Sequence, residues 1–490
     1  MKVESAVRRG LFWVSFSTSA RQGIEFCTAL FLAALLAPED FGVFAMASLV
    51  IGWMGMVRDL GFGAALIHNQ EEIEESAHTA FTLITGTAVV LCAGTWAVSP
   101  IAARFFGTSE LTAVLRVLGF SFIIISLRVV QATMLQKNLN FKKNSIPPLI
   151  SSLAHGIVCV SLALLGYGVW SIVVGSLFGN ALLTVHYWFI SPFRPRLRFK
   201  WQTARRLVGY GNIALLDNIL IFLLMTFDRA AIGRILGVKP LGYYDFAYRV
   251  ANLPATRVTR VVSNVMFPVY SRLQRDVNEL KQTYLQTIRY LAIIVVPVSA
   301  ALAGLGPSFA VLLYGGKWVP ALGALRILVI YGVTTGIGAP AATVLYALGR
   351  PRDSLTINAI KGALTIGFIY HSAVHGGIIG VAALFATVQV VATALLIWRA
   401  NRLLGIEAAD YLHWLGLPAG CTGAAAIMGL ALAARYPAIL QSWTGAIGTS
   451  LILILVYGLL LLRCDGELRS VGSRVWAVCQ SKNPLARSRA

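Results

Sequence analysis

Ionisable and polar residues set in apolar stretches are the part of this sequence that could do chemistry. Six of them recur every three or four residues along one stretch: Asp245, Arg249, Asn252, Thr256, Arg260 and Ser263. At about 100° per residue the six lie in one narrow arc of a helix, and they extend along roughly 27 Å. A stripe of that length favours a water-filled cavity, because a single salt bridge would need only one turn. The alternative stays open that the helix packs internally and that Asp245 and Arg249 form an ion pair.

Shorter sets of charged residues lie in other apolar stretches. Arg21 and Glu25 are four residues apart, so they could neutralise each other or face the same cavity as the longer stripe. Asp217 and Asp228 fall on one helical face, about 20° apart, whereas Arg229 points away from Asp228. Four lone basic residues are equally compatible with a cavity and with the membrane edge: Arg116, Arg128, Arg326 and Lys361.

Together these side chains predict a cavity that is richer in cations than in carboxylates. Guanidinium groups bind phosphate oxygens through paired hydrogen bonds, so the set suits an anionic amphiphile whose phosphate enters the cavity. The carboxylates are candidates to carry a coupling proton or sodium ion: Glu25, Asp217, Asp228 and Asp245. No cysteine–histidine set has the spacing of a metal site, and no Walker A, GxSxG or HExxH motif occurs. The sequence therefore predicts no cofactor, no bound metal and no enzyme.

The elements that must position these residues are membrane-spanning helices. Of 490 residues, 57% are hydrophobic and only 12% are charged, whereas a soluble domain carries about a quarter charged residues. The net charge of +21 comes from basic residues placed mostly between apolar runs, a pattern that indicates a membrane protein and not a nucleic-acid-binding protein. The six cysteines are scattered, mostly within apolar runs, and predict no disulfide framework.

A membrane-spanning helix needs about 20 mostly apolar residues, and about fourteen stretches satisfy that rule. They are residues 11–36, 41–66, 79–103, 111–135, 146–165, 168–190, 207–236, 241–268, 288–313, 321–347, 355–373, 377–399, 412–434 and 444–462. Lys2, Arg8 and Arg9 resemble the start of a signal peptide, but the apolar run that follows is too long for one. The predicted fold is an all-α integral membrane protein with a retained first span.

Lysine and arginine predict the orientation of the spans. They concentrate in every second inter-span segment and in the tail after Leu462, whereas the intervening turns hold only Arg104, Lys239, Lys317 and Arg435. Because basic loops stay in the cytoplasm and the number of predicted spans is even, we expect both termini to be cytoplasmic. The acidic segment 70–78 fits less well, although acidic residues weigh little in this rule.

A short repeat suggests how the spans are grouped. The stretch LLAPEDFGVFAMA aligns without a gap on ILGVKPLGYYDFA when Gly42 is set on Gly242, although a chance match remains the alternative. Six spans precede the basic stretch SPFRPRLRFKWQTARR, so both copies enter the membrane from the same side and define parallel repeats. The predicted divisions are a six-helix lobe at 1–190, a cytoplasmic linker at 191–206, a second six-helix lobe at 207–400, two accessory helices at 401–462 and a basic cytoplasmic tail at 463–490.

The turn Pro38-Glu39-Asp40 raises an enzymatic alternative, because membrane glycosyltransferases also carry acidic residues in their first outer loop. This turn is too short to hold a sugar. A proline followed by acidic residues is a common start of a helix. We therefore expect these residues to begin the second span and to play no catalytic part.

Five phrases spread over the first twelve spans carry a family resemblance. They are LLAPEDFGVFAMASLV, RDLGFGAALIHNQ, DRAAIGRILGVKPLGYYDFAYRV, FPVYSRLQRD and LYALGRPRDS. These phrases resemble Wzx-type exporters of the multidrug/oligosaccharidyl-lipid/polysaccharide (MOP) superfamily. The resemblance implies a MATE/MurJ-like fold with two six-helix lobes and two further helices. It also implies a flippase of the bacterial inner membrane, which moves undecaprenyl-diphosphate-linked oligosaccharide for O-antigen, capsule or exopolysaccharide from the cytoplasmic to the periplasmic leaflet.

For the site, the resemblance implies a cationic lumen, ion antiport and rocking of the two lobes about a mid-membrane site. It assigns substrate contacts to Arg249, Arg257, Arg260, Arg21, Arg128, Lys361 and Asn252, and ion coupling to Glu25, Asp217, Asp228 and Asp245. The implied partners are the lipid-linked oligosaccharide, the bilayer, and a polymerase and chain-length regulator of the same pathway. Three alternatives stay open: an ion-coupled multidrug exporter of the same fold, a membrane-bound polymerase or glycosyltransferase, and an assembly scaffold.

Overall fold

Every regular element in the described part of the computed structural model is a helix. The structure describes residues 2–56, 73–137, 141–201, 203, 226–407, 409–411, 414, 416, 420–424 and 443–464. Contacts within the chain divide it into two compact units, Met1–Asp245 and Phe246–Ala490. The lobe and linker boundaries expected from the sequence stay predictions.

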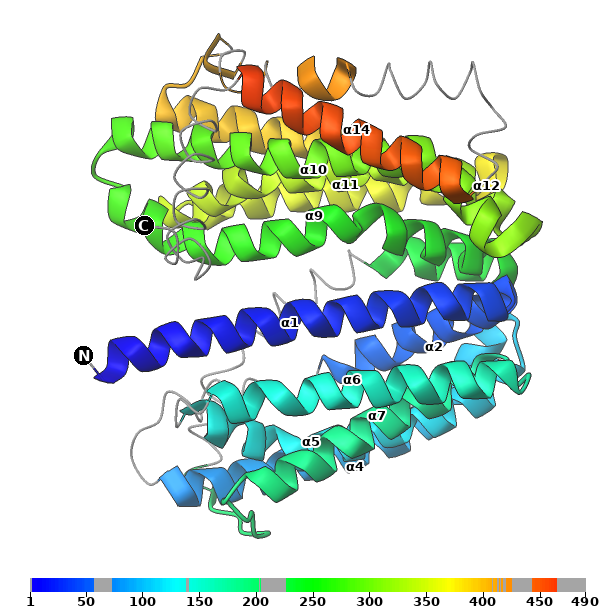
Figure 1. Cartoon of the computed structure of the whole chain (residues 1–490). Coiled ribbons are helices and arrows are strands. Elements are labelled where there is room, and N and C mark those ends of the chain that lie inside the picture. The colour runs from blue at the N-terminus through cyan, green and yellow to red at the C-terminus, as the bar shows by residue number, and fades with distance from the viewer. Residues whose placement is uncertain are drawn as a thin grey trace, which may run out of the picture. The chain divides into compact units, whose positions relative to one another are not determined.

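The first unit contains long helices that correspond to the first six predicted spans. They are α1 (Lys2–Leu35), α2 (Pro38–Gly55), α4 (Ile73–Phe106), α5 (Glu110–Lys137), α6 (Phe141–Leu164) and α7 (Val169–Ile190). These helices run lengthwise beside one another in Figure 1, coloured from blue to green. Helix α1 packs on α6, α4 on α5, and α6 on α7. The end of the second predicted span, 57–66, lies outside the described residues.

The second unit contains the helices of the later predicted spans. They are α10 (Val277–Tyr314), α11 (Val319–Ala347), α12 (Pro351–Leu404), α14 (Trp443–Cys464) and most of α9 (Val238–Leu273), whose first residues belong to the first unit. A short 3-10 turn, η1 (Gly315–Trp318), joins α10 to α11. Most of the predicted span 412–434 and the start of span 207–236 lie outside the described residues.

Seven stretches of the described helices are long and apolar enough to cross a membrane, and they lie in α4–α7 and α10–α12. Helices α1 and α9 are also long enough, at 34 and 36 residues, but they carry the charged residues that the sequence places in spans 1 and 8. The chain is a multi-pass membrane protein, and these helices are consistent with the fourteen predicted spans.

Helix α12 is a hairpin made of two predicted spans. A straight helix of its 54 residues would be about 81 Å long, far more than a bilayer requires. The helix breaks at Gly377, whose φ and ψ are 55° and −145°. Arg399 Nε lies 2.8 Å from Asp353 Oδ2, so the two halves run antiparallel. The predicted spans 355–373 and 377–399 are therefore both present, with their turn at Gly377.

Replacing Gly377 with alanine should destabilise this hairpin. The backbone there lies in a region that side chains with a Cβ rarely adopt, which costs of order 1–3 kcal/mol. Gly376 offers a matched control, because its φ is not positive and an added Cβ would meet nothing within 4 Å. Thermal unfolding in detergent should show a lower Tm for Gly377→Ala than for Gly376→Ala, and equal Tm values would contradict the strain.

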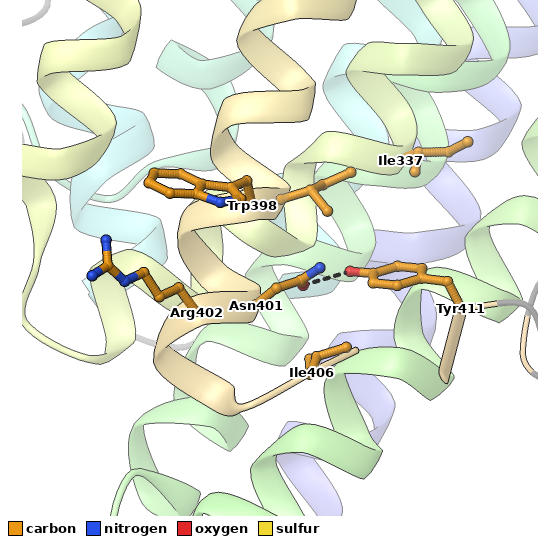
Figure 2. Close-up of a pocket in the computed structure, with 7 residues that line it drawn as sticks. Ile337, Trp398, Asn401, Arg402, Ile406 and Tyr411 are labelled. Carbon is orange, nitrogen blue, oxygen red and sulfur yellow. Dashed lines mark hydrogen bonds between the residues drawn. The ribbon is translucent and has the colours of Figure 1, made fainter. Parts of the chain in front are cut away.

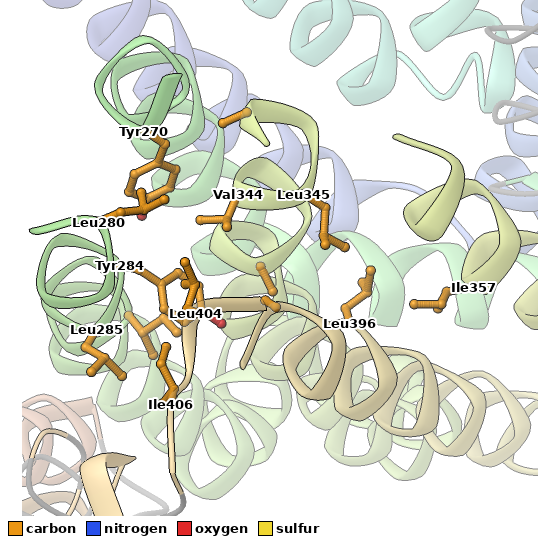
Figure 3. Close-up of a cluster of buried hydrophobic side chains, with 14 of the residues drawn as sticks. Tyr270, Leu280, Tyr284, Leu285, Val344, Leu345, Ile357, Leu396, Leu404 and Ile406 are labelled. Carbon is orange, nitrogen blue, oxygen red and sulfur yellow. The ribbon is translucent and has the colours of Figure 1, made fainter. Parts of the chain in front are cut away.

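The buried core of the second unit gathers where α9–α12 lie close together (Figure 3). Its members include Tyr270 of α9, Tyr284 of α10, Val344 of α11 and Leu396 of α12. Tyr284 Oη is 3.2 Å from the hydroxyl of Tyr411. The buried phenol therefore has the hydrogen-bond partner that burial requires, and this end of the unit is held by both apolar and polar contacts.

Candidate functional site

The polar stripe predicted on α9 follows the border between a packed side and an exposed side of the helix. Asp245 and Asn252 are buried, and Asn252 Nδ2 donates to the Tyr248 carbonyl oxygen at 3.0 Å. Thr343 Oγ1 of α11 lies 3.5 Å from Ser263 Oγ. Arg249, by contrast, is exposed. The side chains of Thr256, Arg257 and Arg260 lie outside the described residues, so their place beside a cavity stays a prediction.

Two of the predicted ion-coupling carboxylates, Asp228 and Asp245, are brought into one buried cluster of the first unit. Asp228 is 0% exposed and its Oδ2 accepts a hydrogen bond from the Tyr244 hydroxyl at 3.1 Å. Arg229 Nε lies 3.5 Å from Asp245 Oδ1. The cluster thus holds two carboxylates around one guanidinium, a composition in which one carboxylate could exchange a proton or bind a cation. Asp217 lies outside the described residues.

Sequence reasoning missed two members of this cluster. They are Tyr244, which lies 16 residues after its partner Asp228, and Arg229, which lies 16 residues before its partner Asp245. Residues that far apart are not neighbours on one helix, so helical spacing cannot reveal these contacts. The only available signal was Tyr244 itself, a phenol at the aligned position of Phe44 in the repeat.

Arg21 and Glu25 form the ion pair that their spacing predicts. Arg21 Nη1 lies 2.6 Å from Glu25 Oε1, and the two side chains are 39% and 41% exposed. Their helix is packed on α6 at Thr28, whose hydroxyl would collide with a Cβ added at Gly156. The pair is therefore partly accessible, and a role in substrate contact or coupling stays a prediction.

Lys361 is held in a polar network between α11 and the two halves of α12. Its ammonium donates to Gln389 Oε1 and lies 5.3 Å from the centroid of the Tyr331 ring. Gln389 Nε2 lies 3.2 Å from Thr393 Oγ1, which in turn donates to the Thr334 carbonyl oxygen at 3.2 Å. The network fixes the charge of Lys361 at one place. Gln389 was not predicted, because it meets Lys361 only through the turn at Gly377.

Gln389→Leu should lower the stability of the protein by about 1–2 kcal/mol, because the Lys361 ammonium loses an acceptor in apolar surroundings. Gln131 of α5 provides a control: it is fully buried, and neither side-chain polar atom has a hydrogen bond among the described residues. Gln131→Leu should therefore be neutral or stabilising. Thermal unfolding of both variants in detergent tests the difference, and a Gln389→Leu protein as stable as wild type would contradict the network.

Arg128 is bound within its own unit. Its Nη1 donates to the side-chain Oδ1 of Asn180 at 3.0 Å and lies 3.3 Å from the Asn180 carbonyl oxygen. Asn180 belongs to α7 and Arg128 to α5. These contacts give the guanidinium a helix-packing role, and its predicted contact with substrate stays a prediction.

The two copies of the repeated turn pack directly on each other. A Cβ added to Gly42 would overlap the Val238 carbonyl oxygen, and a Cβ added to Gly242 would overlap that of Pro38. Val238 and Pro38 are themselves equivalent positions of the repeat. Each glycine therefore meets the first residue of the helix in the other copy, the reciprocal relation that a two-fold axis produces. The backbones approach so closely that only glycine fits at both positions.

Helix-start chemistry explains the acidic residues of the first turn, as predicted. Helix α2 begins at Pro38, and Asp40 Oδ2 accepts a hydrogen bond from the Ala37 amide at 2.8 Å. Glu39 Oε1 lies 2.9 Å from Lys239 Nζ of the other copy. This hydrogen bond lowers the pKa of Glu39 and raises the pKa of Lys239. Both side chains are thus charged at neutral pH. The ion pair is lost only when the pH falls through the lowered pKa of Glu39 or rises through the raised pKa of Lys239.

A pocket of about 510 Å³ opens beside the end of α12 in the second unit (Figure 2). Its lining is mostly apolar, and the polar groups belong to Trp398, Asn401, Arg402 and Tyr411. The full lining is Ile337, Ile397, Trp398, Asn401, Arg402, Ile406 and Tyr411. The Tyr411 hydroxyl donates to Asn401 Oδ1 at 2.8 Å, so both groups are engaged with each other. None of the predicted site residues lines this pocket, and we assign no ligand to it.

Comparison with a protein family covers more than half of the chain. Residues 31–322 match the family described as polysaccharide biosynthesis protein. The matched region includes both copies of the repeated turn, the Asp228 cluster and all of α9.

Curated relatives match over most of their length. The chain is 26% identical to the succinoglycan biosynthesis transport protein ExoT of Rhizobium meliloti, over 76% of each chain. It is 25% identical to the lipopolysaccharide biosynthesis protein WzxC of Escherichia coli, over 85% of this chain and 86% of that protein. It is 25% identical to the teichuronic acid biosynthesis protein TuaB of Bacillus subtilis, over 87% and 89%.

Solved structures confirm the predicted fold. The lipid II flippase MurJ in an inward closed conformation superposes with a TM-score of 0.71 at 15% identity, over 93% of this chain and 99% of that one. An inward-facing MATE-family transporter of the MOP superfamily superposes with a TM-score of 0.64 at 16% identity, over 79% and 94%. The resemblance to Wzx-type exporters of this superfamily is confirmed at the level of family and fold.

Proposed function

The chain belongs to the polysaccharide biosynthesis protein family, and we propose that it transports a lipid-linked oligosaccharide across the membrane. The observation that carries this proposal is the match, over about three quarters or more of the chain, to a succinoglycan transport protein and a lipopolysaccharide biosynthesis protein. The likeness to a lipid II flippase supports the fold that such transport would use.

The charges of the site support a phosphate-bearing substrate. Arg249 is exposed on α9, and Lys361 is held as a fixed cation by Gln389. We propose that these two, with Arg257 and Arg260, contact the diphosphate of an undecaprenyl-linked unit while its lipid tail stays in the bilayer. The chain would then act in the bacterial inner membrane, with both termini cytoplasmic, and move the unit towards the periplasm.

The buried carboxylates support ion coupling in this proposal. Asp228 and Asp245 lie in one cluster with Arg229, and Tyr244 donates to Asp228. A carboxylate in such surroundings can exchange a proton or a sodium ion between two conformations. We propose Asp228 as the first candidate, because it is completely buried. Glu25, Asp217 and Asp245 are the further candidates.

Transport is tested by deleting the gene in its own host and following lipid-linked oligosaccharide in the two leaflets. Wild type should relieve an accumulation on the cytoplasmic side, and the double variant Arg249→Ala/Arg260→Ala should not. Arg249→Lys keeps the charge and should retain part of the activity, while Arg104→Ala, at an exposed position at the end of α4, should behave as wild type. If the units reach the periplasm normally in the deletion strain but polymer is missing, the chain acts after flipping, as a polymerase or scaffold would.

A second candidate is ion-coupled drug export, which the likeness to a MATE-family transporter favours. The same deletion strain separates the two functions. Increased sensitivity to cationic drugs, with normal distribution of the lipid-linked unit, would favour drug export over the proposed flippase.

A further inference from the structure

The basic stretch that follows α7 combines exposed basic and exposed apolar side chains, and none of them belongs to the proposed transport site. We propose that residues 194–201, which we call the strap, bind anionic phospholipid at the membrane surface. In this arrangement the apolar side chains of the strap lie among the outer parts of the acyl chains, and its arginines contact headgroup phosphates. The inference requires only that the chain is a membrane protein, and it does not depend on what the chain transports.

The strap has two chemically different sides. No helix forms between Ser191 and Lys200. The Arg198 amide donates to the Arg196 carbonyl oxygen at 2.9 Å, which makes a three-residue turn at Leu197, and the residue types alternate on both sides of this turn. Basic residues occupy the even positions 194–200, and large apolar residues occupy 197, 199 and 201. The rings of Phe199 and Trp201 lie 6.2 Å apart between centroids, as expected for two side chains on the same side.

The apolar side of the strap is exposed instead of packed. Leu197, Phe199 and Trp201 are 76%, 50% and 71% exposed. Three neighbouring large apolar side chains without a protein contact of matching size mark an interaction surface. Tryptophan is enriched at the boundary between membrane and water, where its ring meets lipid and its N–H meets headgroups.

Backbone hydrogen bonds hold the strap at the level of that boundary. The Arg196 amide donates to His78 Nδ1 at 2.9 Å, and Thr82 Oγ1 donates to the Arg198 carbonyl oxygen at 3.0 Å. Lys200 forms an ion pair with Glu75. The membrane-compatible part of α4 begins at Glu74, and that of α7 ends at Ile190. The strap therefore lies where two apolar helices leave the hydrocarbon layer.

The charge of the strap selects the class of lipid. Arg194, Arg196 and Arg198 are exposed, and no acidic residue lies between 191 and 206. Exposed guanidinium groups next to apolar side chains fit a glycerophospholipid with a net negative headgroup, such as phosphatidylglycerol. A zwitterionic surface would satisfy the apolar side and leave the three arginines without matching charge.

Spin labelling tests both sides of the strap in the full-length protein. The six native cysteines are replaced, and single cysteines at each position from 196 to 201 carry a nitroxide in vesicles of phosphatidylglycerol and phosphatidylethanolamine. Labels at 197, 199 and 201 should be more accessible to oxygen, and labels at 196, 198 and 200 to a water-soluble nickel complex. Val90, 69% exposed on α4, and Ser109, exposed in the next turn, provide the lipid and water references.

Two results would overturn the proposal. Labels at all six positions that behave like the Ser109 reference would show that the strap lies in water. For labels at 199 and 201, the accessibility to oxygen relative to the nickel complex should fall by about two-fold in vesicles of phosphatidylcholine alone. The triple variant Arg194→Gln/Arg196→Gln/Arg198→Gln should show the same fall in vesicles that contain phosphatidylglycerol. An unchanged preference in both cases would show that the contact is apolar only and that anionic lipid is not its partner.

Discussion

Gly42→Ala and Gly242→Ala should each destabilise the protein by about 3 kcal/mol and reduce transport to a small fraction of wild type. In both variants the new methyl group overlaps a backbone carbonyl oxygen, that of Val238 or that of Pro38. Overpacked side chains usually cost about 1–3 kcal/mol, and a backbone atom inside a helix start can move less than a side chain. We therefore expect the upper end of that range.

The reciprocal contact leads to a second, more specific prediction about these two glycines. Because each glycine meets the same position of the other copy, the two single variants should have similar effects. The double variant should lose less than the sum, since backbones already pushed apart by one methyl group have room for the other. Strict additivity would show that the two contacts are independent.

Gly23→Ala is the control for this experiment. An added Cβ at Gly23 would meet nothing within 4 Å, and alanine is favoured over glycine in a helix by about 1 kcal/mol. The control should therefore be as stable as wild type or more so. Unfolding in detergent and the leaflet assay, run on all four variants, measure stability and transport separately. Variants at 42 and 242 that match Gly23→Ala would disprove the close approach of the two turns.

Asp245→Ala should also have a large effect, a loss of about 3 kcal/mol in the free energy of unfolding. The substitution removes the carboxylate that lies 3.5 Å from Arg229 Nε, where the two side chains are 3% and 19% exposed. Breaking a buried ion pair by removing one partner typically costs about 3–5 kcal/mol, because a charge stays behind in apolar surroundings. We expect the lower end, since Asp228 lies in the same cluster and can compensate in part.

The ion pair between Asp353 and Arg399 supplies the matched control. Its atoms are 2.8 Å apart, but the side chains are 25% and 27% exposed. Water can solvate the remaining charge, so Asp353→Ala should cost less than about 1 kcal/mol. Replacing both members of the buried pair, as Arg229→Met/Asp245→Leu, should recover part of the loss. Equal losses for Asp245→Ala and Asp353→Ala would show that the Asp228 cluster is hydrated.

Composition and periodicity were sufficient to predict the membrane location and the helices, and the family was indicated by the resemblance of five short phrases of the sequence. Apolar content along the chain decides whether a segment enters lipid, and a helix satisfies its own backbone hydrogen bonds, so both properties are local. The i,i+4 pair of Arg21 and Glu25 was predictable for the same reason. The repeated turn was also visible in the sequence, because equivalent residues keep their order along the chain.

The partners of the buried charges depended on the folded chain. Asp245 and Arg249 lie four residues apart, so their pairing could be considered from the sequence, whereas the contact of Asp245 with Arg229 at 3.5 Å could not. Lys361 meets Gln389 only because Gly377 reverses α12. The reciprocal packing of Gly42 and Gly242 likewise joins residues 200 positions apart. Helical periodicity specifies which side of a helix a residue occupies, whereas the residue that it meets depends on which helix packs against that side, and this is a property of the tertiary structure.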